Sequence, residues 1–270
     1  MEYIPQQHTT SHIVRFESYG VTAEVRFHPS IFPDDLYGVL PPGWRPAGSN
    51  AASVVFGIDD VMTQGQRMHR LKRNGRVIAE CENVKDALHF LESRLQLYIA
   101  ERTEQQVFVH AGAVEYQGKA LLLPGRSFAG KTTLVAALLR AGANYLSDEF
   151  AVLDRHGRVH GYPRRLAMRD ENGLRVQRLT AEDFGSRIAV DPVPVGLAAH
   201  IRYKSEGKWR VKETSLGTMA LAMMNNTVCA RRQPDAWMNV LGLALGSAKC
   251  IMGKRGDADD AARRLLALLG

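Results

Sequence analysis

The chain has 270 residues, of which 45% are hydrophobic and 23% charged, so we expect one large domain or two modest ones with a real core. No apolar run reaches the roughly 18 residues needed to span a bilayer, and the N-terminus has no secretory signal. The three cysteines, Cys81, Cys229 and Cys250, match neither a disulfide framework nor a zinc site. Together these observations favour a cytoplasmic protein without a membrane partner. The net charge of +7 favours phosphates or acidic peptides, and because the basic residues are scattered we expect no nucleic-acid partner.

The first part of the chain, residues 1–105, is predicted to be a β-rich domain that ends in a helix. Its clearest signal is Asn74-Gly75 between two β-rich runs, because a type I′ hairpin turn needs positive φ at both central residues. Asn83 is the expected N-cap of the helix, whose apolar residues recur at steps of three and four. Further strands are predicted at residues 12–17 and 21–27.

The second part, residues 106–270, is predicted to alternate strands and helices, which is typical of an α/β domain. A continuous apolar run at 120–123 indicates a buried strand, and a helix is expected after it at 132–140. The closing helix begins at about Asp257, where acidic residues face the positive end of the helix dipole. Other predicted strands are at 107–110 and 144–147, with a hairpin formed by 150–154 and 158–162.

One segment between the buried strand and the helix carries a phosphate-binding signature. It fits the pattern G-x-x-x-x-G-K-[ST] at every fixed position, and a strand precedes it and a helix follows it, as the pattern requires. Glycines let backbone N–H groups turn inward around a phosphate, and the start of the helix offers more of them. Arg126 either touches the γ-phosphate or faces solvent. The predicted nucleotide-binding residues are Gly125, Arg126, Ser127, Phe128, Ala129, Gly130, Lys131, Thr132 and Thr133.

An acidic pair follows at a spacing that fits a magnesium site. Asp148 and Glu149 come after a predicted strand, and the seventeen residues from Lys131 to Asp148 suffice for a three-turn helix, a turn at Gly142 and one strand. Strand ends of this kind are where open α/β sheets bind ligands, and Mg²⁺ needs a carboxylate near the phosphates. The alternative is an acidic pair in solvent. Transporter-type and motor-type ATPases place their acidic strand much farther downstream.

These motifs resemble the HPr kinase/phosphorylase superfamily, whose P-loop fold is shared with phosphoenolpyruvate carboxykinase. The resemblance covers about 107–154, with a weaker similarity at 249–268. The segment rich in arginine and glycine that marks authentic HPr kinase/phosphorylase is missing, so the chain resembles the divergent HPr-kinase-like proteins, some of which phosphorylate serine on precursor peptides. The matching stretches are His110-Ala111-Gly112-Ala113-Val114, Gly118-Lys119-Ala120-Leu121-Leu122-Leu123-Pro124-Gly125 and Leu146-Ser147-Asp148-Glu149.

The resemblance implies an ATP- and Mg²⁺-dependent kinase that phosphorylates a hydroxyl, with the serine of a peptide or protein as acceptor. In that family pattern Asp148 takes the proton of the acceptor hydroxyl, while Glu149 and Thr132 help to hold Mg²⁺. Lys131 neutralises phosphate charge, and His110 lies beside the phosphate site or is simply structural.

Three other functions remain open at this stage: a kinase for a small-molecule hydroxyl, a nucleotide-sensing module without transfer, and an ATPase that uses water as acceptor. The intact Lys131, Thr132 and Asp148 argue against the sensing module. The β-rich N-terminal domain is expected to hold a polypeptide partner, or else to support a homo-oligomer.

Overall fold

The computed structural model describes residues 12–48, 52–125, 129–169, 176–228 and 234–270. The chain divides into two compact units, residues 1–104 and 105–270, which are described separately. Helices and mixed sheets occur together, which fits the expected α/β class. No helix in the described ranges is both long enough and apolar enough to cross a membrane.

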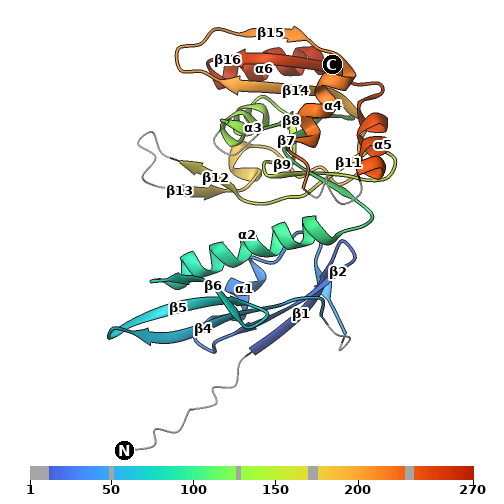
Figure 1. Ribbon diagram of the computed structural model, residues 1–270. Coiled ribbons are helices and arrows are strands. Elements are labelled where there is room, and N and C mark those ends of the chain that lie inside the picture. The colour runs from blue at the N-terminus through green and yellow to red at the C-terminus, as the bar shows by residue number, and fades with distance from the viewer. Residues whose placement is uncertain (1–11, 49–51, 126–128, 170–175, 229–233) are drawn as a thin grey trace, which may run out of the picture. The chain divides into compact units, whose positions relative to one another are not determined.

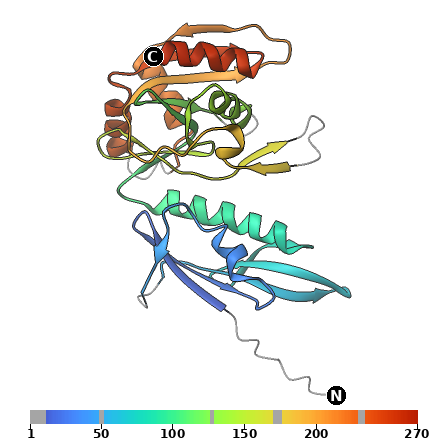
Figure 2. The same ribbon diagram turned by 180° about the vertical axis from the view of Figure 1, so that it is seen from behind.

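The first unit is a six-stranded sheet in the order β3-β1-β2-β4-β5-β6. Figure 1 and Figure 2 both show the long helix α2 lying along one face of this sheet. Side chains from both layers, among them Phe56, Leu71, Leu91 and Leu95, are fully buried between them. The elements are β1 His12–Ser18, β2 Val21–Phe27, α1 Pro33–Tyr37, β3 Arg45–Pro46, β4 Val55–Thr63, β5 Gln66–Arg73, β6 Arg76–Cys81 and α2 Val84–Arg102.

The turn, the helix cap and the two strands that the sequence predicts in this unit are confirmed by the structure. β5 and β6 form an antiparallel hairpin, and its turn residues Asn74 and Gly75 have φ of 48° and 81°. Asn83 caps α2, because its Oδ1 accepts a 2.9 Å hydrogen bond from the backbone N of Asp86. The predicted strands at 12–17 and 21–27 are β1 and β2.

A polar cluster around Asp60 ties β4 and β5 to the segment after β2. The carboxylate of Asp60 accepts hydrogen bonds from Ser30 Oγ at 2.9 Å and from His69 Nδ1 at 2.7 Å, and it forms an ion pair with Arg67. Although partial burial opposes this, the bonds from Arg67, Ser30 and His69 hold the pKa of Asp60 below its usual value.

The second unit has an eight-stranded sheet in the order β11-β10-β7-β8-β14-β16-β15, with β9 also paired to β7. β14 is parallel to both β8 and β16, so these three strands end at the same edge of the sheet. The elements are β7 Val107–Tyr116, β8 Lys119–Pro124, α3 Lys131–Arg140, β9 Asn144–Ser147, β10 Phe150–Leu153, β11 Val159–His160, β12 Leu166–Arg169, β13 Val176–Leu179, a short 3₁₀ helix Glu182–Phe184, β14 Val195–Tyr203, β15 Arg210–Glu213, α4 Leu216–Met224, α5 Pro234–Leu245, β16 Lys249–Arg255 and α6 Ala258–Leu269.

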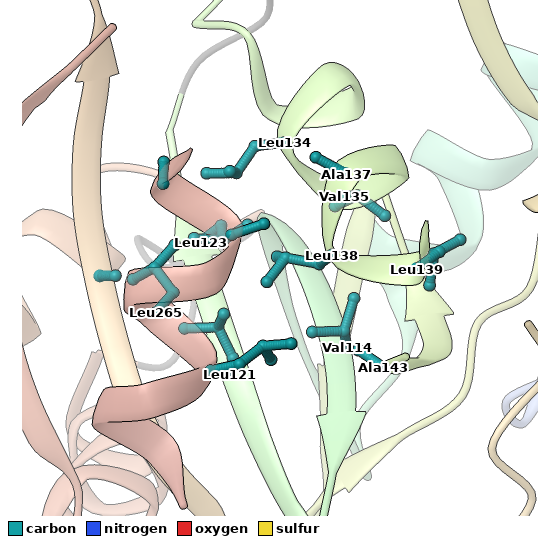
Figure 3. Packing of buried hydrophobic residues seen from close by; sticks show 14 of the residues in the cluster. Val114, Leu121, Leu123, Leu134, Val135, Ala137, Leu138, Leu139, Ala143 and Leu265 are labelled. Carbon is teal, nitrogen blue, oxygen red and sulfur yellow. The ribbon is translucent and has the colours of Figure 1, made fainter. Parts of the chain in front are cut away.

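Helices cover both faces of this sheet, and alternate residues of the buried strand β8 serve the two faces. Leu121 and Leu123 pack with α3 and α6, as Figure 3 shows, whereas Leu122 belongs to the cluster that includes α4 and α5. A strand buried on both faces reads as a continuous apolar run, which is why residues 120–123 were recognisable in the sequence. The predicted helix at 132–140 is α3, and Asp257 caps the closing helix α6.

The acidic pair directly follows β9, as expected, and a second strand begins immediately after it. β9 ends at Ser147, but the chain continues directly into β10, and both strands pair with β7 in antiparallel order. The backbone carbonyl of Glu149 accepts a 3.1 Å hydrogen bond from Ala111 N, so pairing persists across the interruption. Asp148 and Glu149 therefore follow the C-terminal end of β9, as expected, in a two-residue interruption before β10.

Candidate functional site

The glycine-rich segment leads from β8 directly into α3. Gly130 is the N-cap of α3 and has φ of 78°, a left-handed conformation that favours glycine. A Cβ at this position would lie 2.9 Å from Arg255 Nη2 and 3.2 Å from Tyr203 Cβ, so the neighbours also restrict it to glycine. At Gly125, by contrast, a Cβ would meet nothing closer than 3.6 Å. The predicted residues Arg126, Ser127 and Phe128 lie outside the described residues.

Lys131 is the first residue of α3 and is only 9% exposed. Its Nζ donates a 2.8 Å hydrogen bond to the carbonyl oxygen of Gly125 and lies 3.4 Å from His110 Nε2. Burial lowers the pKa of Lys131, although the negative charges of Glu149 and Asp148 act in the opposite direction. The lysine therefore reaches back to Gly125, and the charges of the acidic pair act on its ammonium group.

Asp148 is nearly enclosed, at 7% exposure, and both of its carboxylate oxygens accept hydrogen bonds. The hydroxyl of Tyr145 donates to Oδ1 at 2.9 Å, and the hydroxyl of Thr132 donates to Oδ2 at 3.2 Å. Burial raises the pKa of Asp148 despite the bond from Tyr145 and the charge of Arg164. Asp148 thus links the first turn of α3 to β9.

Glu149 is the more accessible acid, with 40% of its side chain exposed. Its Oε1 lies 3.3 Å from Nε2 of His110, the same nitrogen that faces Lys131. Burial raises the pKa of Glu149, but the hydrogen bond and charge of His110, with the charges of Arg164 and Lys131, outweigh it and hold the pKa below its usual value. Lys131 and Glu149 therefore both contact the same nitrogen of His110.

The structure brings together all five residues to which the sequence assigned catalytic or metal-binding roles: His110, Lys131, Thr132, Asp148 and Glu149. Of the other predicted nucleotide-binding residues in the described ranges, Ala129 lies just before the helix and Thr133 is exposed on its first turn.

Three further residues of the site were missed by the sequence analysis: Tyr145, Arg255 and Arg164, whose charge acts on both Asp148 and Glu149. Tyr145 points from β9 to Asp148, and the guanidinium of Arg255, at the end of β16, donates a 2.8 Å hydrogen bond to the carbonyl oxygen of Gly130. The spacing Tyr-x-x-Asp across the end of a strand was the only local signal for the first. Nothing near Arg255 in the sequence indicates its contact with a residue 125 positions away.

The oxygen ligands available here suit magnesium bound together with phosphates. Among the described residues no group of three or more His, Cys, Asp and Glu side chains is arranged to hold a metal ion. What the site offers is a threonine hydroxyl and two carboxylates, from Thr132, Asp148 and Glu149. Mg²⁺ is typically bound by one or two carboxylates plus substrate phosphates, with water completing its octahedron, so the set fits a metal–nucleotide complex.

Comparison of the chain with models of known protein families and with curated proteins found no match. The chemistry of the site itself is therefore the basis for a function.

Proposed function

We propose that this chain is an ATP- and Mg²⁺-dependent phosphotransferase of the cytoplasm, with a P-loop core of the HPr kinase type, that phosphorylates a hydroxyl group. A serine of a peptide or protein is the proposed acceptor. The observation that carries the proposal is the position of the buried Lys131. It begins α3 directly after Gly130, whose φ is left-handed, and the charges of Asp148 and Glu149 act on it. Cationic and N–H groups for phosphates thus meet oxygen ligands for a metal at one sheet edge.

Each part of the site has a distinct task in this reaction. Bound Mg-ATP supplies the phosphoryl group and a cation that neutralises its charge. The N–H groups at the start of α3 and the Lys131 ammonium would hold the phosphates, since the helix N-terminus and the ammonium both carry positive charge. Thr132, Asp148 and Glu149 would hold the metal. The burial of Asp148 strengthens its electrostatic contacts relative to water.

The proton of the acceptor hydroxyl needs a carboxylate within hydrogen-bond reach. The resemblance assigns this task to Asp148, whose two oxygens each accept one hydrogen bond, from Tyr145 and Thr132, and each keep a lone pair for a further partner. Glu149 is the more exposed acid, and its contact with His110 stabilises the ionised form that accepts a proton. Glu149 is therefore the competing candidate for the base, with Asp148 then serving the metal through Thr132.

The proposed function is tested by incubating the full chain with γ-labelled ATP, Mg²⁺ and two separate pools, one of cellular polypeptides and one of small metabolites. Lys131→Ala is the inactive variant, because loss of one buried charged phosphate contact typically costs about 2–5 kcal/mol. Lys85→Ala, an exposed lysine on α2, is the matched control. We expect label in the polypeptide pool with the native chain and with Lys85→Ala, and none with Lys131→Ala.

Other results identify the rival functions. Label only in the small-molecule pool indicates a metabolite kinase, and label only in inorganic phosphate indicates an ATPase. ATP binding without turnover in any pool indicates a sensing module. Full turnover by Lys131→Ala would refute the assignment of the phosphate site. If a polypeptide is labelled, added salt should slow the transfer, since screening shortens the reach of the +7 net charge toward an acidic segment.

A further inference from the structure

Arg255 is a buried arginine at the edge of the sheet where the site lies. It ends β16 and pairs in register with Tyr203, the last residue of the parallel neighbour β14. Its side chain passes over the Tyr203 ring, with the guanidinium carbon 5.3 Å from the ring centre, and the residue is only 2% exposed. The carboxyl ends of two parallel strands thus aim this cation at the start of α3.

The guanidinium contacts carbonyl oxygens and not a carboxylate. Nη2 donates to the Gly130 carbonyl at 2.8 Å, and Nη1 donates to the Gly256 carbonyl at 2.8 Å. Within the described part of the chain, no Asp or Glu forms an ion pair with Arg255; Asp257 caps α6, and its charge only partly opposes the lowering of the Arg255 pKa by burial. Residues 126–128, which precede Gly130, include no acidic side chain.

A buried charge of this kind is costly. Removal of an ion from water costs several kcal/mol even after relaxation, and the usual compensation is an ionic partner. Two neutral carbonyl groups offset only part of this cost, because hydrogen bonds to them return less than the lost hydration of a full charge. Close by lie two further positive elements, the N-terminus of α3 and Lys131. Their combined field favours a multiply charged anion.

We propose that Arg255 is a positioning residue for the phosphate site, whose charge is neutralised by the polyphosphate of the bound nucleotide. The inference rests on the proposed function and deepens it. Through Gly130 the arginine fixes the N-cap of α3, and therefore the direction of the N–H groups that meet the phosphates. Its charge adds to that of Lys131, whose Nζ contacts Gly125 and His110 instead of Gly130. The ligand class that satisfies both cations is a di- or triphosphate.

The test uses the full chain and inorganic tripolyphosphate with Mg²⁺ as probe. Arg255→Gln keeps an N–H donor for the Gly130 carbonyl but removes the charge, whereas Arg255→Met removes both. Arg140→Gln, at the far end of the same helix and 46% exposed, is the matched control. Calorimetry gives the affinity for tripolyphosphate, and thermal unfolding without ligand gives the stability of each variant.

We expect Arg255→Gln to bind tripolyphosphate about tenfold or more weakly than the native chain, since charged hydrogen bonds and pairs are roughly twice as strong as neutral ones. Its unfolding temperature without ligand should equal or exceed the native value, because an uncompensated charge is gone. Arg255→Met, which also loses the bond to Gly130, should bind tripolyphosphate more weakly still, and Arg140→Gln as tightly as the native chain.

The opposite pattern overturns the inference. If Arg255→Gln and Arg255→Met bind tripolyphosphate as tightly as the native chain and only unfold at lower temperature, the arginine has a structural role alone. In that case the proposed function still stands on the transfer experiment with Lys131→Ala. If the native chain itself binds neither tripolyphosphate nor Mg-ATP, both the inference and the proposed function fail.

Discussion

Replacing Tyr145 by phenylalanine removes a single hydroxyl from an enclosed part of the site. That hydroxyl donates the 2.9 Å hydrogen bond to Asp148 Oδ1, and the tyrosine is only 1% exposed, so water cannot readily replace it. A hydrogen bond to a charged group contributes about 1.5–3 kcal/mol. Its loss therefore increases the proton affinity of the Asp148 carboxylate roughly ten- to a hundredfold, since about 1.4 kcal/mol corresponds to a factor of ten.

The assay is the pH dependence of kcat/KM for phosphoryl transfer. Asp148 must be ionised both as a base and as a metal ligand, so either role predicts that the acid limb of the profile moves to higher pH in Tyr145→Phe. The plateau at high pH should remain near the native rate. Tyr116→Phe, a half-buried tyrosine at the end of β7, is the control and should leave the profile unchanged.

Stability gives an independent reading of the same contact. Burial raises the folded-state pKa of Asp148, so its ionised form is less stable in the folded chain than in the unfolded one, and this penalty applies above the folded pKa. Loss of the Tyr145 bond enlarges the penalty. The difference in urea stability between native chain and variant should be greatest at neutral pH and shrink as pH falls. An unmoved acid limb together with a pH-independent stability difference would refute the reasoning.

The remaining predictions concern the other described contacts. Asp148→Asn should retain Mg-ATP binding but lose about 10²- to 10⁴-fold in transfer, whereas an active Asp148→Asn beside an inactive Glu149→Gln would make Glu149 the base. Gly130→Ala should lose about 1–2 kcal/mol of stability because its φ is left-handed, and more because the new Cβ contacts Arg255. Gly142→Ala should lose only the stability that depends on φ, because its φ is 98° but a Cβ there meets nothing within 4 Å. Asp60→Asn should destabilise the chain by about 1–2 kcal/mol at neutral pH. Because the folded pKa of Asp60 is lowered, this difference is full above the unfolded value of about 3.9 and should vanish as pH falls through the folded pKa, which urea unfolding at several pH values measures.

Features encoded by neighbouring residues could be predicted from the sequence. The turn at Asn74 and Gly75 needs two positive φ values, the cap at Asn83 needs one side-chain oxygen, and the buried strand β8 needs an apolar run. Each depends on a few adjacent residues, so no knowledge of the rest of the chain is required. The grouping of Lys131, Thr132 and Asp148 was also predictable, because only one helix and one strand lie between them.

Features that depend on distant pairing were not predictable in the same way. The ten-residue length of β7 lets it pair with both β9 and β10, and no local pattern indicated that the two strands flanking Asp148 and Glu149 share this partner. The order β8-β14-β16 joins strands that are separated by most of the second unit. Arg255 acquires its place in the site only through that order, so no local pattern around it indicates the contact with Gly130.

The bond between Arg255 and Gly130 has a consequence for how the site forms during folding. It joins residues 125 positions apart, and it requires that β14 already lies between β8 and β16. Contacts of such long sequence separation carry a large loop-closure entropy and form late. After the ribosome has synthesised Lys131, Asp148 and Glu149, it must still add more than a hundred residues before it reaches Arg255. The nascent chain therefore carries the local parts of its phosphate site well before it can complete the site.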